Sequence, residues 1–388
     1  MPDLPFDRQE YRDRIARVRA AMEQRGIGVL VVSDPSNMAW LTGYDGWSFY
    51  VHQAVVLGAG GDPVWWGRAM DANGARRTVF MNESDIHGYD DTYVQNPDKH
   101  PMEVLAALIR DRFEGRVGVE LDNYYYSAAA HRALSRGLGA EPEDVTGLVN
   151  WCRAVKSPAE IEFMRRAAGI VDAMHQTILE TAEPGMPKNA LVAEIYRAAI
   201  NGANGHWGDY PAIVPMAPSG VDATAPHLTW DDRPLRRGEA TFFEIAGVYR
   251  RYHAPQSRTL FFGRPPQKYL DAEAAVLEAV DAGLEQARPG NRAEDIANAF
   301  NAALNRRGFV KDSRCGYAIG LSYPPDWGER TISFRRGDRT VLKPGMTFHF
   351  MPALWLDDGG LEITEPILIT DSGAECLCTT PRRLFVKD

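Results

Sequence analysis

The sequence predicts two domains, an α/β domain over residues 1–150 and an α+β domain over residues 151–388. Its 388 residues, 45% hydrophobic and 24% charged, suffice for two ordinary cores. Strand-like and helix-like segments alternate up to about residue 150, which is typical of a compact α/β fold. Longer helices and β-rich segments follow. No low-complexity linker separates the two parts, so the boundary rests on this change of pattern.

The first expected element is a surface helix near the N-terminus. Its apolar stripe consists of Tyr11, Ile15, Val18 and Met22, spaced by four, three and four residues. Gly26 stands where a helix C-terminus favours a left-handed residue. We therefore expect an amphipathic helix that ends just before Gly26.

The following segments predict strands. The stretch VLVVSDPSNMAWLTGY predicts a short buried strand followed by an Asp-Pro-Ser-Asn turn. The stretch HQAVVLGAGGDPVWWG predicts a hairpin around GAGGDP. Together they give the first domain its strands.

The second domain is expected to open on a helix at SPAE. Ser157 can cap this helix, Pro158 can occupy its first turn, and Glu160 can complete a capping box. Further helices are predicted over residues 188–203 and 270–287. Strand character is found in ATFFEIAGVYRRYHA, SRTLFFG, GMTFHFMPALW and LEITEPILIT.

Composition excludes several classes of protein. The net charge of −9 and pI near 5.6 argue against a nucleic-acid or anionic-membrane partner, because either needs a basic surface. No apolar stretch approaches the roughly 20 residues of a membrane helix, and the opening residues lack an apolar signal region. We expect a cytoplasmic protein. The cysteines are too few and too irregularly spaced for a disulfide framework, and we expect reduced thiols at Cys152, Cys315, Cys376 and Cys378.

Several ordered segments resemble the creatinase, aminopeptidase P and prolidase family, whose C-terminal domain has the pita-bread fold. RAVKSPAEIEFMRRA resembles its domain-opening helix, and GEATFFEIAGVYRRYHAPQSRTLFFG resembles its central hairpin. GYAIGL is similar to its GHGIGL segment, and LKPGMTFHFMPALW to its LKPGMVFTIEPGLY strand. With NMAWLTGY in the first domain, these segments cover nearly the whole chain. The resemblance implies a creatinase-like N-terminal domain and a pita-bread catalytic domain.

The metal positions of the peptidases are replaced in this chain. Family members hold two divalent ions with two Asp, one His and two Glu, which are matched here by Glu244, Pro255, Tyr317, Met351 and Thr364. Proline and methionine cannot supply hard oxygen ligands, so we expect no metal and no other cofactor. Creatinase hydrolyses a carbon–nitrogen bond without metal. Within the family, YRRYHAPQSRT and GYAIGLSYPPDWGERT are most similar to ectoine hydrolases, which open a cyclic amidine to N-acetyl-2,4-diaminobutyrate.

Three catalytic residues are expected from this resemblance. Glu244, at the first metal position, is expected to pair with the amidinium cation or to attack its carbon. His227 matches the proton-shuttling histidine of creatinase-like enzymes. Glu365, with Glu362 as the less favoured choice, is expected to supply a second carboxylate. The offset of Glu365 by one residue from the family position is unfavourable, because it reverses the face of a regular strand.

Substrate-binding residues are expected around these three. His253 and His349 stand beside replaced metal positions, and Tyr317 and Trp327 can form an aromatic wall for a flat cation. In dimeric relatives the N-terminal domain of one subunit covers the active site of the other. This implies a pocket-closing role for the aromatic residues Trp47, Phe49 and Tyr50. The candidates for binding the substrate carboxylate are Arg68, Arg76, Arg77 and Arg258.

Other functions stay open at this level. The alternatives are a creatine-like amidinohydrolase, an Xaa-Pro metallopeptidase relative, and a ligand-binding pseudoenzyme. The resemblance further implies a homodimer, a small-molecule substrate (ectoine or also hydroxyectoine), and association with a downstream deacetylase. Whether the acetyl group stays on the α or the γ nitrogen is not determined by the sequence.

Overall fold

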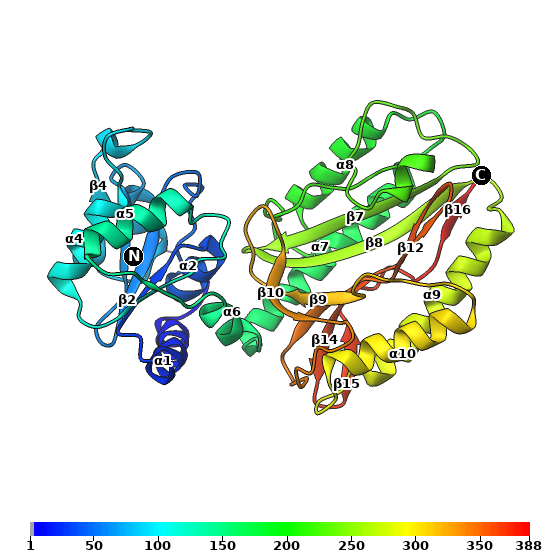
Figure 1. Cartoon of the computed structure of the whole chain (residues 1–388). Coiled ribbons are helices and arrows are strands. Elements are labelled where there is room, and N and C mark those ends of the chain that lie inside the picture. The colour runs from blue at the N-terminus through cyan, green and yellow to red at the C-terminus, as the bar shows by residue number, and fades with distance from the viewer. Residues whose placement is uncertain (1–3) are drawn as a thin grey trace. The chain divides into compact units, whose positions relative to one another are not determined.

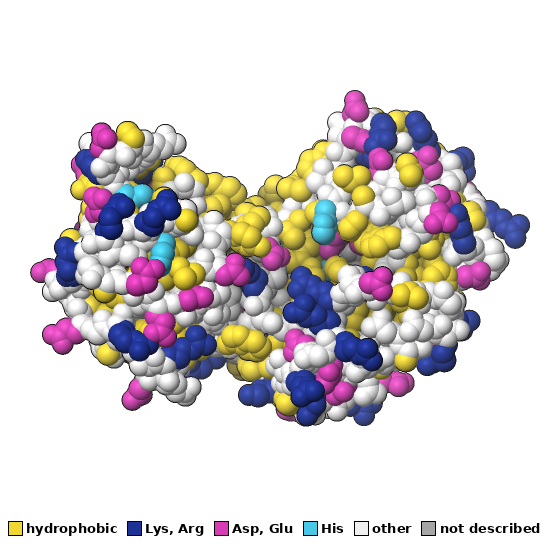
Figure 2. All heavy atoms as spheres, in the orientation of Figure 1, with side chains coloured by type: hydrophobic (Ala, Val, Ile, Leu, Met, Phe, Trp, Pro, Cys, Tyr) yellow, Lys and Arg dark blue, Asp and Glu magenta, His cyan; other side chains and the backbone are white. Residues whose placement is uncertain are grey.

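The computed structural model describes residues 4–388, which form two compact units (Figure 1). The first unit ends at Arg153, and the second runs from Ala154 to Asp388. No helix among the described residues is long and apolar enough to cross a membrane. On the face that Figure 2 shows, Lys and Arg side chains are interspersed with acidic ones over both units.

The first unit is built on a mixed six-stranded sheet in the order β4-β3-β2-β1-β5-β6. The strands are β1 Val29–Val32, β2 Ala54–Gly58, β3 Val64–Arg68, β4 Ile86–Tyr89, β5 Val117–Val119 and β6 Glu143–Asp144. The helices are α1 Arg8–Gln24, α2 Pro35–Thr42, α3 Ala72–Thr78, α4 Met102–Arg112, α5 Ala128–Leu138 and α6 Leu148–Arg153, with 3-10 turns at Glu83–Asp85 and Asp91–Tyr93. Every residue of β1 and β2 is buried, as expected for a sheet covered on both faces.

The local predictions for this unit were mostly right. α1 buries the predicted stripe, and Gly26 has a φ of 66° in the left-handed region. The predicted hairpin is formed by β2 and β3. The predicted Asp-Pro-Ser-Asn turn was wrong, because these residues begin α2: the Asp34 carboxylate accepts the Ser36 N–H at 2.7 Å, and Pro35 occupies the first helical position.

The second unit contains three sheets wrapped by helices (Figure 1). A three-stranded sheet holds β7 Ala240–Tyr249, β8 Tyr252–Phe262 and β16 Phe385–Lys387, and a two-stranded sheet holds β12 Ala353–Leu356 and β13 Gly359–Glu362. A five-stranded sheet has the order β10 Gly328–Ser333, β9 Gly316–Ile319, β11 Thr347–Phe350, β14 Glu365–Thr370 and β15 Gly373–Cys376. The helices are α7 Pro158–Thr181, α8 Lys188–Asn201, α9 Gln267–Gln286 and α10 Ala293–Arg306, with a 3-10 turn at Gly220–Thr224. The predicted combination of an α/β and an α+β domain is confirmed.

The long β7–β8 hairpin carries the candidate active site. Its strands are joined by Arg250 and Arg251, whose φ values of 47° and 66° are those of a two-residue turn with both central residues left-handed. This turn fixes the register, so that Tyr249 pairs with Tyr252 and Glu244 pairs with Ser257. The hairpin therefore places Glu244 and Ser257 side by side on one face.

The N-terminus of α7 has the predicted capping box. Ser157 Oγ accepts the Glu160 N–H at 3.3 Å, and the Glu160 carboxylate accepts the Ser157 N–H at 2.8 Å. We expect Ser157→Ala to lower the free energy of unfolding by about 1 kcal/mol, because the helix loses one capping bond. Denaturant titration measures this loss. Ser157→Thr keeps the accepting oxygen, so an equal loss in both variants would contradict a capping role.

Candidate active site

Glu244 is the central residue of the candidate site. It lies in the middle of β7, and its side chain is only 7% exposed. Its backbone is fixed by two hydrogen bonds with Met216, of 3.0 and 3.2 Å. Burial, and then the charge of Glu362, raise the pKa of Glu244 well above its usual value, whereas Lys311 opposes the shift. Glu244 is thus a buried carboxyl group whose charge is influenced by a second carboxyl group.

Glu362 is this second carboxyl group. It ends β13, is 2% exposed, and its backbone N–H donates to Thr259 Oγ1 on β8 at 2.8 Å. Burial raises its pKa to about 7, against the lowering effects of Ser257 and Lys311. The Ser257 hydroxyl lies close enough to Glu362 to lower its pKa, but neither Glu362 Oε2 nor Ser257 Oγ makes a well-formed hydrogen bond within the described residues. Two polar atoms beside Glu244 are therefore available to a ligand that donates hydrogen bonds.

Glu365 was the favoured second carboxylate, and its surroundings in the structure do not support that choice. Its carboxylate accepts hydrogen bonds from Arg258 Nη2 at 2.6 Å and from Gln256 Nε2 at 3.1 Å. Both members of the Arg258–Glu365 ion pair are buried, with side chains 3% exposed. Glu365 is therefore occupied within the protein, whereas the charge of Glu362 acts on Glu244.

Tyr317 and Trp327, the two residues expected to form an aromatic wall, lie together with His349. Trp327 Nε1–H donates to the Tyr317 hydroxyl oxygen at 2.8 Å, and that hydroxyl is 3.0 Å from His349 Nδ1. His349 Nε2 is 2.7 Å from Thr364 Oγ1, which also accepts the Ser257 N–H at 2.7 Å. Burial lowers the pKa of His349 to about 3, so the imidazole is neutral. A continuous hydrogen-bonded chain thus connects the aromatic residues to the strand position opposite Glu244.

The other two predicted histidines lie in different environments. His253 is fully buried: its Nδ1–H donates to the Arg251 carbonyl at 2.8 Å, and its Nε2 accepts the Ala212 N–H at 2.8 Å. Both ring nitrogens are thus used by the backbone, which makes His253 a scaffold residue rather than a substrate ligand. His227 is exposed, in the segment after the 3-10 turn at Gly220–Thr224.

The donor set at the candidate site does not fit a pair of divalent metal ions. Pro255 and Met351 offer no hard oxygen ligand, and Tyr317 is engaged by His349 and Trp327. The charge of Lys311 also acts directly on Glu362. Among residues 4–388, no group of three or more His, Cys, Asp or Glu side chains is arranged to hold a metal ion.

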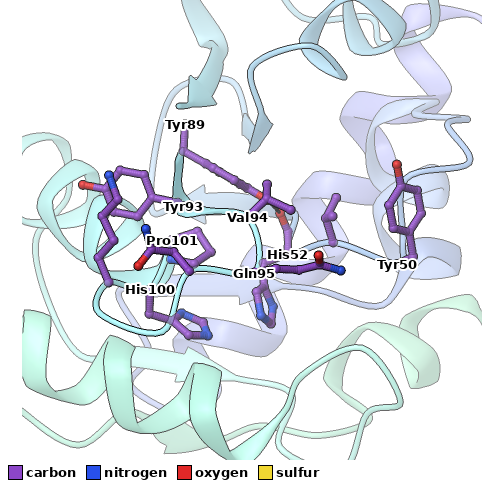
Figure 3. A pocket seen from close by; sticks show the side chains of 11 residues that line it. Tyr50, His52, Tyr89, Tyr93, Val94, Gln95, His100 and Pro101 are labelled. Carbon is purple, nitrogen blue, oxygen red and sulfur yellow. Dashed lines mark hydrogen bonds between the residues drawn. The ribbon is translucent and has the colours of Figure 1, made fainter. Parts of the chain in front are cut away.

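The aromatic residues predicted to close the pocket lie in the first unit. Trp47 and Tyr50 are 59% and 69% exposed, and the Trp47 ring lies 4.7 Å from that of Phe49. Tyr50 also lines a cavity of about 260 Å³ together with His52 and His100 (Figure 3). Burial, and then the charge of His100, lower the pKa of His52 to about 4.

The arginines predicted as candidates for the substrate carboxylate are mostly engaged. Arg68 forms an ion pair with Asp91 at 2.5 Å, and Arg76 pairs with Glu83 at 3.1 Å. Arg258 is saturated by Glu365 and by backbone carbonyls. Arg77 is exposed.

Sequence reasoning missed Ser257 and Lys311. Ser257 was recoverable from the hairpin, since a two-residue turn at Arg250 and Arg251 fixes its pairing with Glu244. Lys311 lies in the irregular segment between α10 and β9, and no spacing in the sequence connects it to Glu244.

Comparisons with known proteins agree with this architecture. Residues 162–371 match the metallopeptidase family M24, and residues 14–155 match the creatinase/prolidase N-terminal domain. The chain is 62% identical to an ectoine hydrolase of Halomonas elongata, over 99% of each chain, and 41% identical to an uncharacterized hydrolase/peptidase of Sinorhizobium fredii, also over 99% of each. The prolidase of Pyrococcus horikoshii shares the fold, with a TM-score of 0.82 and 20% identity over 96% of this chain and all of that one. The chain therefore belongs to the creatinase and prolidase branch of the M24 family.

Proposed function

We propose that the protein is an ectoine hydrolase, which opens the cyclic amidine of ectoine to N-acetyl-2,4-diaminobutyrate without a metal ion. The observation that carries the proposal is the buried Glu244–Glu362 pair, in which Glu362 Oε2 and the neighbouring Ser257 Oγ make no well-formed hydrogen bond within the described residues. A protonated amidine is a planar cation whose N–H groups can donate to such oxygens. The relative of Halomonas elongata, which carries the name ectoine hydrolase, supports the choice of substrate.

The proposed reaction adds one water molecule to the amidine carbon and breaks one ring carbon–nitrogen bond. In one route Glu244 attacks the carbon and forms a covalent intermediate, which water then hydrolyses. In the other, Glu244 binds the cation and water attacks directly. In both routes the departing ring nitrogen receives a proton, for which the protonated Glu362 carboxyl group and His227 are the proposed donors. The bond that breaks decides between the α-acetyl and γ-acetyl products.

Tyr317 is the proposed aromatic contact for the cation, through the ring face opposite the Arg314 guanidinium, which lies 4.4 Å from the ring centroid. Trp327 and His349 are fully buried behind hydrogen bonds to the Tyr317 hydroxyl, so they orient its ring. The neutral state of His349 adds no positive charge to a site that receives a cation.

Homodimerisation and a deacetylase partner belong to the same proposal. The exposed aromatic side chains of Trp47 and Tyr50 suit a surface that is covered by a second copy of the chain. An N-acetylated diamino acid is a substrate for a deacetylase, which is the class of enzyme expected to act next. Light scattering tests the first claim, and co-purification with such an enzyme tests the second.

Metal removal tests the proposed chemistry. Protein treated with EDTA should convert ectoine at an unchanged rate, because the proposed site needs no metal ion. Proton NMR follows the loss of the ring 2-methyl signal and the appearance of an N-acetyl signal, and the product spectrum identifies the acetylated nitrogen. Creatine and an Xaa-Pro dipeptide serve as competing substrates. Activity that returns only with added Mn²⁺ or Zn²⁺ would contradict the proposal, as would binding of ectoine without turnover.

A further inference from the structure

Lys311 brings a positive charge to the carboxyl pair. Its side chain is largely buried, and its Nζ donates to the Ala353 carbonyl oxygen at 3.4 Å. Ala353 pairs with Glu362 in the β12–β13 register, so the ammonium group lies beside the backbone that carries Glu362. The charge of Lys311 acts on both Glu362 and Glu244.

The other ionisable groups around the pair do not offer the same charge. Burial raises the pKa of the Cys315 thiol to about 12 and that of Tyr317 well above its usual value, so both are neutral near pH 7. The charge of Arg314 acts on Tyr317 and on the neutral His349. Glu365 is compensated by Arg258. Among residues 4–388, Lys311 is therefore the cation whose charge is shown to act on both members of the pair.

We propose that Lys311 is a positioning residue, whose ammonium group keeps at least one carboxylate of the Glu244–Glu362 pair ionised in its buried setting. This role rests on the proposed function, since an ionised carboxylate is what pairs with the amidinium or attacks it.

A measurement without substrate tests the proposal independently of ectoine turnover. When folding raises the pKa of a carboxyl group, the folded protein loses stability as pH rises from the unfolded-state pKa to the folded-state pKa. For Glu362 these pKa values are near 4.5 and about 7. In Lys311→Met the folded-state pKa values of Glu244 and Glu362 should rise further. The melting temperature should therefore keep falling up to a pH roughly 1–2 units higher than in wild type. The gap between wild type and variant should then widen from pH 7 to pH 9. Lys311→Arg should follow wild type, as should Lys343→Met, which removes an exposed lysine of the same unit.

The same variants should also differ in the pH dependence of kcat/KM. In Lys311→Met the acid limb of kcat/KM should move upward by roughly 1–2 pH units, which is a 10- to 100-fold loss on that limb. Lys311→Arg should restore the position of the limb. An equal loss of stability at every pH, together with an unmoved acid limb, would reduce Lys311 to a packing residue and overturn the proposal. If wild type fails to hydrolyse ectoine, the stability series alone still decides the role of Lys311.

Discussion

Glu244→Gln is expected to lower kcat for ectoine hydrolysis by at least roughly 10³-fold, because a neutral amide neither pairs with an amidinium ion nor attacks its carbon. The substitution should not lower the stability of the folded protein. The pKa of Glu244 is raised well above 4.5 by burial and by Glu362, so its ionised form costs stability at neutral pH. The variant should therefore melt at the same temperature as wild type or higher.

The pairing of lost activity with unchanged or increased stability is the informative result. Steady-state kinetics and thermal melts on one preparation provide both values. Glu365→Gln is the matched control, because Glu365 is also a buried glutamate but is held by Arg258. It should keep kcat within several-fold of wild type. If Glu365→Gln lost as much activity as Glu244→Gln, the assignment of the second carboxylate to Glu362 would be wrong.

Intermediate trapping would distinguish the two routes proposed for Glu244. A covalent route predicts that protein quenched during turnover carries an added mass on the peptide that contains Glu244. The direct route predicts an unmodified peptide, with the amidinium ion held only by charge. Mass spectrometry of the quenched digest makes this distinction.

Local signals in the sequence predicted most of the fold, because those signals act through neighbouring residues. The capping box at Ser157 and the left-handed Gly26 each depend on a few consecutive positions. The segment after Ser33 was ambiguous for the same reason: Asp34 and Pro35 suit both a turn and a helix start. Burial of the residues that follow, including Trp40, is a tertiary effect that a turn prediction does not contain.

The candidate site was predictable where a strand register fixes it and not elsewhere. Glu244 was expected because the resemblance matches it to the first metal position of the family, and the hairpin register places it opposite Ser257. We propose Glu362 in place of Glu365 because Arg258, which lies more than 100 residues away along the chain, binds the Glu365 carboxylate. Both hydrogen bonds of His253 go to backbone groups, which no residue pattern predicts. Long-range pairing therefore decided which of the candidate side chains remained available.

Arg258→Met is expected to lower the free energy of unfolding by roughly 3–5 kcal/mol, a larger loss than that of Ser157→Ala. The guanidinium group donates to Glu365 at 2.6 Å and to the carbonyl oxygens of Thr364, Thr380 and Pro381 at 2.6 to 2.8 Å. Methionine fills the space but leaves a buried carboxyl group and three carbonyl groups without their donor. The midpoint of chemical denaturation measures this loss.

The double variant Arg258→Met/Glu365→Gln shows how much of the stability loss comes from the buried charge of Glu365 and how much from the lost hydrogen bonds of Arg258. If the Glu365 charge, left with Gln256 at 3.1 Å and Arg382 at 3.8 Å, causes most of the loss, the second substitution should recover a large part of it, because a neutral amide is cheaper to bury than a poorly compensated carboxylate. Arg258→Lys should recover little, since an ammonium group cannot reach Glu365 and the carbonyls of Thr380 and Pro381 with the planar fork of arginine. Full rescue by lysine would contradict the view that Arg258 joins β14 to the 380–381 segment through several directed bonds.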